Sequence, residues 1–285
     1  MKTGVVLKRV GGFCHVLADG YKYICRLRGR LKLEVDAILP GDRVRINSEQ
    51  QTVEEILPRR VTLTRPPIAN VEQVVIVLSL TEPAPDWLFL DRLLVLVAAA
   101  GLDSLICFNK RDLVDEPEGG LYARLGYRTF YTSARTGEGI SPLREALAGR
   151  ISCFAGASGV GKSALLNCII PGASLKVGAV SQRLQRGRHT TRSVELLPLP
   201  EGGLVADTPG FSRLSLNHVE PSDLGHCFPE MAALAESCQF TGCLHHQEPN
   251  CAVKEALDRG EVDAGRYRSY LVFLQEIQSY QRQKY

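Results

Sequence analysis

The sequence predicts a multidomain α/β protein with three parts: an N-terminal β-barrel, a central domain built on a parallel sheet, and a helical C-terminal domain that binds metal. Several short strand patterns separated by turn signals fill residues 1–57. Apolar runs then alternate with helical patterns, and polar motifs follow the ends of these runs. A cluster of cysteine and histidine residues comes after them. A chain of 285 residues is long enough for two or three domains.

The composition is that of an ordinary soluble globular protein, with 45% hydrophobic and 23% charged residues. No apolar core or cleavage pattern follows the first basic residues, so we expect no secretory signal. The most apolar stretch, near residues 93–102, is about half of the ~20 residues that a membrane span needs. We therefore expect a cytoplasmic protein without membrane association. In that reducing compartment the scattered cysteines are expected to be buried thiols: Cys14, Cys25, Cys107, Cys153 and Cys168.

The first strand patterns predict a small barrel of the OB type. Turn signals such as Gly11-Gly12 and Asp19-Gly20 separate the strands. The expected strands are Gly4–Val10, Phe13–Leu17, Lys22–Arg26 and Asp42–Asn47. Residues 58–67 are interpreted as a linker because they are rich in proline and arginine.

The barrel segment is basic, although the whole chain carries a net charge of only +3. Residues 1–65 contain thirteen Lys and Arg against seven Asp and Glu, which suggests a polyanionic partner. Basic residues alternate along one stretch and would share one face of a strand, where they could contact phosphates. These residues are Arg26, Arg28, Arg30 and Lys32. A solvated barrel face is the alternative interpretation.

The central domain, residues 66–216, alternates buried strands with helices. A helix is expected over residues 86–100. The expected strands are residues 74–78, 104–108, 129–132, 152–154 and 204–206. Asn109, Ser133, Gly156 and Asp207 each follow a strand directly. A parallel sheet gathers such positions at one edge, where it binds ligands.

A phosphate-binding loop follows the fourth of these strands, because Gly156-x4-Gly161-Lys162-Ser163 matches that pattern completely. Its glycines let backbone N–H groups surround a phosphate, and the helix that follows adds its N-terminal dipole. Lys162 is expected to reach the β- and γ-phosphates and to assist catalysis, and Ser163 to bind Mg²⁺. The expected nucleotide-binding residues here are Gly156, Ala157, Ser158, Gly159, Val160, Gly161, Lys162, Ser163 and Ala164. A glycine-rich turn without a ligand is the alternative.

The stretch Asp207-Thr208-Pro209-Gly210 supplies a second part of a nucleotide site. Asp207 is expected to hold Mg²⁺ through water, and Gly210 to offer an amide to the γ-phosphate. Alone, this tetrapeptide is a common turn. Its place after a buried strand downstream of the phosphate loop favours the nucleotide interpretation.

The motif Asn109-Lys110-Arg111-Asp112 indicates a guanine base. The Asp112 carboxylate can accept hydrogen bonds from guanine N1–H and the amino group. Adenine lacks that donor pair, which would cost several kcal/mol. Lys110 would lie along the purine, and Ser133-Ala134 would bring a backbone N–H to O6. These residues favour GTP over ATP and argue against an ATP-dependent kinase, and Asn109 joins them as a nucleotide-binding residue.

The motifs occur in rotated order, since an ordinary GTPase has its phosphate loop first and its guanine motif near the end. Residues 178–192 lie between the phosphate loop and Asp207 and are polar and basic, so we expect a mobile switch loop. Thr190 and Thr191 are candidates for a second Mg²⁺ ligand, and Thr191 is preferred.

The position after Asp-x-x-Gly, often Gln in GTPases, is Phe211, which cannot orient a water molecule. His189 is the candidate that can hydrogen-bond a water at neutral pH. Its alternative role is to contact a partner or to order the switch. We expect slow intrinsic turnover that a partner accelerates.

The C-terminal segment carries the pattern Cys238-x4-Cys243-x-His245-x5-Cys251. Three thiolates and one imidazole suit a tetrahedral, structural Zn²⁺ site. His246 could replace His245, although the spacing favours His245. Cys227 is expected to pack in a helix. Unligated cysteines are the alternative, and a reducing compartment argues against disulfides.

Together these motifs resemble the circularly permuted, small-ribosomal-subunit-dependent GTPases of the RsgA (YjeQ/YloQ) family. The resemblance covers the whole chain, including Gly187-Arg188-His189-Thr190-Thr191. It implies an OB barrel (1–65), a circularly permuted P-loop GTPase domain (66–216) and a zinc-binding helical domain (217–285). It also implies a late role in maturation of the bacterial small subunit, with rRNA as the partner and GTP hydrolysis stimulated by that subunit. We expect a monomer that binds GTP or GDP, Mg²⁺ and one zinc ion.

An RNA-binding scaffold that uses the nucleotide only structurally is the alternative function. The intact Lys162, Ser163 and Asp207 argue against it. The rotated order also suggests a lever, because the chain runs from Asp207–Gly210 almost directly into the zinc domain. A γ-phosphate-dependent movement there would reposition that domain relative to the barrel.

Overall fold

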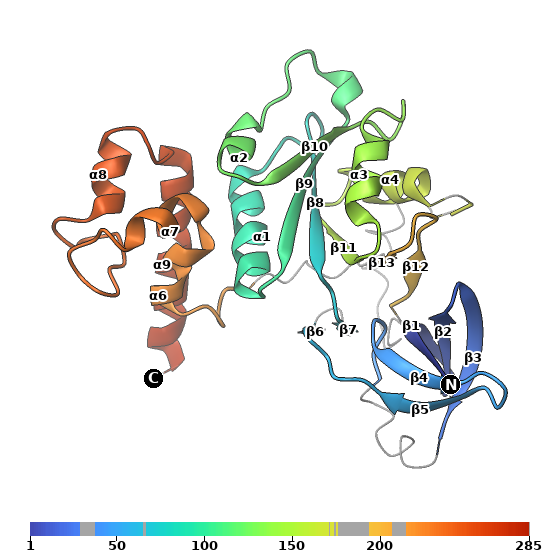
Figure 1. The fold of residues 1–285 in the computed structure, drawn as a ribbon. Coiled ribbons are helices and arrows are strands. Elements are labelled where there is room, and N and C mark those ends of the chain that lie inside the picture. Colours follow the sequence, from blue (N-terminus) through green and yellow to red (C-terminus); the bar gives the residue numbers. More distant parts are fainter. Residues whose placement is uncertain are drawn as a thin grey trace.

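The three parts expected from the sequence are present in the computed structural model (Figure 1). It describes residues 1–28, 38–64, 67–170, 172–173, 175, 194–206 and 215–284. The barrel and the C-terminal helices lie on opposite sides of the central α/β domain (Figure 1). Within the described ranges, no helix combines the length and apolarity needed to cross a membrane.

The N-terminal part is a closed five-stranded barrel in the order β1-β2-β3-β5-β4, which confirms the predicted type. Its strands are β1 (Lys2–Val10), β2 (Phe13–Ala18), β3 (Tyr21–Leu27), β4 (Arg43–Asn47) and β5 (Thr52–Ile56). The sequence indicated four of them and missed β5. Thr-Val-Glu-Glu-Ile is a weak strand pattern, because two carboxylates are adjacent in it. Barrel closure places β5 parallel to β3 and antiparallel to β4.

The expected basic stripe is only partly described. Arg26 and Arg28 are exposed on either side of the buried Leu27, as alternation predicts. Arg28 forms an ion pair with Glu54. The Arg26 guanidinium lies over the Phe13 ring, 5.4 Å from its centroid. Arg30 and Lys32 lie outside the described residues.

The linker contacts the barrel through a buried charge. Asp42, fully buried, accepts hydrogen bonds from Arg59 Nε at 2.6 Å and Arg59 Nη2 at 2.8 Å. Two short strands, β6 (Thr62–Thr64) and β7 (Pro67–Ala69), then pair antiparallel before the central sheet begins. The domain boundaries themselves stay a prediction.

The central sheet has six strands in the order β10-β9-β8-β11-β13-β12, of which only β12 is antiparallel. All five strand patterns identified in the sequence correspond to strands here. The strands are β8 (Gln73–Ser79), β9 (Asp103–Asn109), β10 (Arg128–Thr132), β11 (Ile151–Ala155), β12 (Leu196–Pro198) and β13 (Leu204–Ala206). All seven residues of β8 are buried, because both faces of the sheet are covered.

Alternate residues of β8 explain how the two faces are covered. Val74, Ile76 and Leu78 belong to a core that includes residues of α1 (Trp87–Ala99). Val75 and Val77 point to the other core, with α3 (Ile140–Leu147) and α4 (Lys162–Ile169). A short helix, α2 (Gly120–Arg124), precedes β10.

The C-terminal domain packs against α1, the helix on the first face of the sheet. Val95 and Leu96 of α1 share a hydrophobic core with Phe273, Leu274 and Ile277 of the last helix. The domain contains α6 (Pro221–Leu224), the 3-10 turn η4 (Gly225–Cys227), α7 (Pro229–Ala235), α8 (Ala252–Asp258) and α9 (Ala264–Lys284). The tail helix therefore docks on protein, a point that the sequence left open.

The five scattered cysteines form no disulfides. Cys14, Cys25, Cys107 and Cys153 are buried, as expected. The expected burial of Cys168 is wrong: it is partly exposed, because its thiol faces the loop after β10 at the Ala134 carbonyl. Burial raises the pKa of Cys107 and of Cys153 to about 12, so these thiols are protonated and unreactive at neutral pH.

Candidate nucleotide site and metal centre

Three of the expected loops meet at the carboxyl edge of the sheet. Asn109 is the last residue of β9, Ser133 follows β10, and Gly156 follows β11. Neighbouring strands here are parallel, so their carboxyl ends lie at the same edge. β13, the strand before Asp207, is also parallel to β11. Asp207 itself lies outside the described residues.

The phosphate loop has the open backbone that its glycines predict. Gly156, Gly159 and Gly161 have φ values of 140°, 84° and 98°, a region that disfavours other residues. Residues 157–159 are exposed, whereas Val160 is buried and anchors the loop. A side chain at Gly156 would place its Cβ 2.2 Å from the Val77 carbonyl oxygen. The loop can therefore lie close to the sheet only with glycine here.

Lys162 lies against the loop that precedes it. Its Nζ donates hydrogen bonds to the carbonyls of Gly156 at 2.8 Å and Ala157 at 2.6 Å. Ser163 is buried at the start of α4, next to the loop. The ammonium and the hydroxyl thus both lie at the N-terminal end of a helix, where anions are favoured.

Asn109 ties the three loops together, a role that sequence reasoning did not identify. Its side-chain Nδ2 donates to the Val160 carbonyl at 2.9 Å. Its Oδ1 accepts from the Ala134 backbone N–H at 3.3 Å and from the Thr132 hydroxyl at 3.4 Å. The side chain is 2% exposed, so these bonds are shielded from water. In the sequence, the signal for this role was an asparagine at the end of an apolar strand pattern.

Asp112 is oriented by residues from the loop after β10. The Ser133 hydroxyl donates to its Oδ1 at 2.6 Å, and Arg135 Nε donates to its Oδ2 at 2.8 Å. The Ser133 hydrogen bond, followed by that of Arg135, lowers the pKa of Asp112 below the ordinary aspartate value. The carboxylate is therefore charged at neutral pH. Sequence reasoning missed Arg135, which is 74% exposed.

Lys110 and Ala134 also lie at the carboxyl edge of the sheet. Lys110 adopts a left-handed backbone, with φ 66°, and its ammonium donates to the Glu82 carbonyl. The Cys168 thiol bonds the Ala134 carbonyl at 3.2 Å. Residues 109–112 and the phosphate loop are thus neighbours in space, although the chain reaches them in rotated order.

Four of the expected site residues cannot be placed. His189, Thr191, Asp207 and Gly210 lie outside the described residues. Their roles, and the choice of Thr191 over Thr190, stay predictions.

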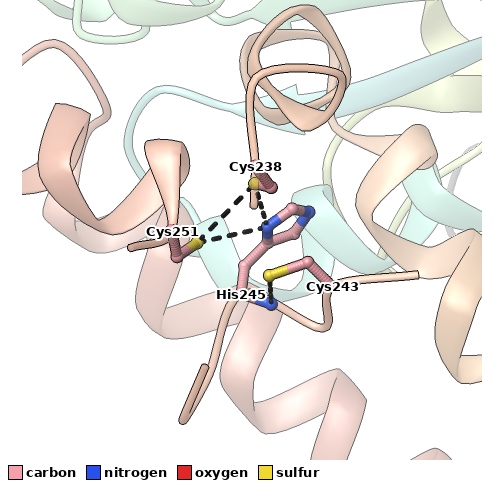
Figure 2. A group of neighbouring side chains, drawn as sticks. All are labelled: Cys238, Cys243, His245 and Cys251. Atoms are coloured by element: carbon pink, nitrogen blue, oxygen red, sulfur yellow. Dashed lines mark hydrogen bonds between the residues drawn. The ribbon is translucent and has the colours of Figure 1, made fainter. Parts of the chain in front are cut away.

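The Cys/His cluster is brought together in the C-terminal domain (Figure 2). One ligand atom from each of Cys238, Cys243, His245 and Cys251 lies within 4.8 Å of all the others. His245 Nδ1 faces Cys238 Sγ at 3.5 Å and Cys251 Sγ at 3.4 Å. This geometry and donor set fit one metal ion.

Burial and position separate these four residues from their neighbours. Burial lowers the pKa of His245, so its imidazole is neutral at pH 7, the form that binds a metal. His246 is exposed and does not join the group. Cys227 instead packs in the core of the domain, within η4, as expected.

Comparison with known proteins identifies the family and the fold. The RsgA GTPase family matches residues 56–217, and the RsgA N-terminal domain family matches residues 3–54. The chain belongs to the RsgA GTPase family. It is therefore a GTP hydrolase, and its motif order is the circularly permuted one.

Relatives within the RsgA family match along the whole chain. The small ribosomal subunit biogenesis GTPase RsgA of Moorella thermoacetica is 49% identical over 96% of this chain and 97% of the relative. That of Shouchella clausii is 43% identical over 99% of both chains. The crystal structure of YjeQ from Thermotoga maritima has a TM-score of 0.82 and 36% identity, covering 97% of this chain and 98% of that one. YloQ, described as a circularly permuted GTPase, has a TM-score of 0.82 and 35% identity, covering 98% of this chain and 96% of that one.

Proposed function

We propose that this RsgA-family GTPase binds the small ribosomal subunit, acts in its late maturation, and hydrolyses GTP to GDP and phosphate with stimulation by the subunit. The hydrogen bond from Asn109 Nδ2 to the Val160 carbonyl carries the proposal, because it joins the guanine motif to the phosphate loop. The partner is supported by relatives whose names specify small-subunit biogenesis. The basic barrel segment adds the electrostatic character that RNA requires. We expect the protein to act as a monomer in the cytoplasm.

The residues at the sheet edge have distinct roles in this proposal. Asp112 reads guanine with a carboxylate that Ser133 and Arg135 hold charged and oriented. Lys110 lies along the base, and the Ala134 N–H approaches O6. The remaining nucleotide contacts come from Asn109, the loop residues 156–164, Asp207 and Gly210.

Two metal ions have separate functions. Ser163, Thr191 and Asp207 would hold Mg²⁺, which neutralises charge on the phosphates when bound. Cys238, Cys243, His245 and Cys251 would hold one Zn²⁺, supported by their mutual approach within 4.8 Å. A closed Cys₃His set is a structural site because no position is left for substrate.

Hydrolysis requires a group that orients the attacking water. Phe211 offers no hydrogen bond, so His189 takes this role in our proposal. Lys162 stabilises charge on the phosphates from its place within the loop.

The decisive experiment measures the rate of GTP hydrolysis against the concentration of small ribosomal subunits. We expect a rate that rises and saturates for the unmodified chain, and a fall of about 100-fold in the stimulated rate for His189→Ala. His218→Ala is the matched control, because His218 is an exposed histidine outside the site. Binding to subunits without stimulated hydrolysis would favour the RNA-binding scaffold instead. Equal displacement of GTP by ATP would revive the kinase interpretation.

A further inference from the structure

Two tyrosines of α9 hold the backbone of the loop that carries the metal ligands. The Tyr267 hydroxyl donates to the His245 carbonyl at 2.7 Å, and the Tyr270 hydroxyl donates to the Leu244 carbonyl at 2.6 Å. Tyr270 is fully buried. The metal loop is therefore attached to α9 through two successive peptide carbonyls, one on each side of the His245 Cα.

His245 needs this support, because its backbone is in an unusual conformation. Its φ is 51°, in the left-handed region that residues other than glycine seldom adopt. Glu248 also fixes the loop. Its carboxylate accepts the backbone N–H groups of Leu244, His246 and Gln247 at 2.9, 3.0 and 3.1 Å. The conformation that aims the imidazole at the cysteines thus depends on contacts outside the ligand set.

The same helix binds the GTPase core. Arg266, beside Tyr267 in sequence, forms a buried ion pair with Asp91 of α1. Further along α9, Glu276 binds Arg92 of α1 through two hydrogen bonds, at 2.9 and 2.6 Å. α1 packs in turn on the sheet whose strand β9 ends at the guanine motif. One rigid element thus contacts both the metal loop and the nucleotide-binding domain.

We propose that Tyr267 and Tyr270 are positioning residues that couple metal binding to the docking of α9 on α1. The metal fixes the conformation of the loop. The loop carbonyls bind the two tyrosine hydroxyls and so keep the start of α9 in the position in which it packs on α1. Coupling between metal binding and helix docking is reciprocal. Docking of α9 raises the affinity for the metal by the same factor by which the bound metal raises the equilibrium constant for docking. The inference rests on the metal site assigned under the proposed function.

The first test measures Zn²⁺ affinity of the full chain by competition with a chromophoric chelator. Tyr267→Phe and Tyr270→Phe remove only the hydroxyls, and each is expected to weaken Zn²⁺ binding by roughly threefold to tenfold. The double substitution is expected to weaken it by about 10- to 100-fold, as for other groups that orient metal ligands. Tyr280→Phe is the control, because Tyr280 lies on the same helix and is 39% exposed. Circular dichroism verifies that each variant is folded.

The second test separates coupling from simple local support. Hydrogen exchange of α9 amides is measured with and without Zn²⁺, and we expect faster exchange when Zn²⁺ is removed. Glu276→Gln weakens the bond to Arg92 far from the metal, and it should accelerate exchange of α9 amides in the Zn²⁺-free chain. Added Zn²⁺ should slow this exchange again, because the metal favours docked α9. Glu261→Gln is the matched control, since Glu261 pairs only with Arg259 on the surface among the described contacts.

The outcomes distinguish the two proposals. Unchanged Zn²⁺ affinity in the tyrosine double variant, or exchange of α9 amides that Zn²⁺ does not slow, would overturn the coupling while the metal site stood. Failure of the unmodified chain to bind Zn²⁺ would overturn both. The GTPase proposal is tested separately, by stimulated GTP hydrolysis, and does not depend on either result.

Discussion

Arg266 of α9 and Asp91 of α1 form an ion pair in the protein interior, with side chains 1% and 2% exposed. Arg266 also binds Glu230 of α7 at 2.8 Å, and its guanidinium lies 4.5 Å from the centroid of the Phe228 ring. The Tyr122 hydroxyl donates a further hydrogen bond to Asp91 at 2.8 Å. A rotation of the C-terminal domain against α1 would separate charges that water does not reach. We therefore expect any nucleotide-dependent lever to move α1 and the C-terminal helices together.

Replacement of Arg266 by leucine should be strongly destabilising. It leaves the carboxylates of Asp91 and Glu230 buried without their cation, and loss of one partner from a buried pair costs about 3–5 kcal/mol. Urea denaturation followed by circular dichroism measures the loss. Arg259→Ala is the control because that arginine forms a surface pair with Glu261, and we expect no measurable change. A small effect at Arg266 would mean that water enters this interface.

Substitution of Gly161 by alanine should abolish nucleotide binding. The new Cβ would lie 2.2 Å from Asn109 Nδ2, so the Asn109 side chain or the phosphate loop must move, and the Asn109 bond to the Val160 carbonyl is lost. Gly126→Ala is the matched control: its φ of 89° is also positive, but no atom lies within 4 Å of the added Cβ. The control therefore tests backbone strain alone, about 1 kcal/mol. GDP affinity measured by calorimetry should fall for Gly161→Ala only; equal losses would show that strain, not the contact with Asn109, matters.

Ser133→Ala should move the acid limb of GTP binding to higher pH. The folded-state pKa of Asp112 is lowered mainly by the Ser133 hydroxyl, so the binding that its carboxylate provides is present above the ordinary aspartate pKa. That binding disappears as pH falls through the lowered value. Without the hydroxyl the pKa rises, and affinity is lost earlier on acidification. Affinity measured from pH 7 down to ~4 gives the shift.

The control for that titration is Arg135→Ala. Arg135 bonds the same carboxylate, but it is 74% exposed and its charge is screened by solvent. We expect a smaller displacement of the acid limb than for Ser133→Ala. The reverse order would identify Arg135 as the main determinant of the Asp112 charge.

Asp42→Ala should loosen the connection between the barrel and the linker. Asp42 is fully buried, and besides Arg59 it accepts the Leu39 N–H at 2.8 Å. Its removal leaves a partly buried guanidinium without its carboxylate, and we expect a loss of about 2–4 kcal/mol. Limited proteolysis near residues 58–67 and thermal unfolding would report it. Glu55→Ala, which breaks an exposed pair with Arg45, is the comparison that should leave both readouts unchanged.

Local patterns in the sequence were sufficient for much of the fold and for the position of the candidate site. The phosphate loop depends on glycines spaced within eight residues, and the strands on continuous apolar runs such as residues 74–78, which burial on both faces requires. The structure confirms the barrel, the five parallel strands and the grouping of Cys238, Cys243, His245 and Cys251. The sequence did not predict β5, because its pairing with β3 follows from closure of the barrel and not from a strong strand pattern in its own residues.

Only the tertiary structure decided how the parts bind each other. The Asn109 bond to Val160 joins residues 51 positions apart, and the Arg266 bond to Asp91 joins residues 175 positions apart. The docking of α9 on α1 and the hydrogen bond from Tyr267 to the metal loop also cannot be predicted from a short stretch of sequence. Backbone preference and hydrophobic periodicity act over a few neighbouring residues, so a sequence read by itself specifies strands, helices and ligand loops. Which buried charges and hydroxyls become partners depends on the packing of the complete chain, because only that packing brings them within hydrogen-bonding distance and excludes water from them.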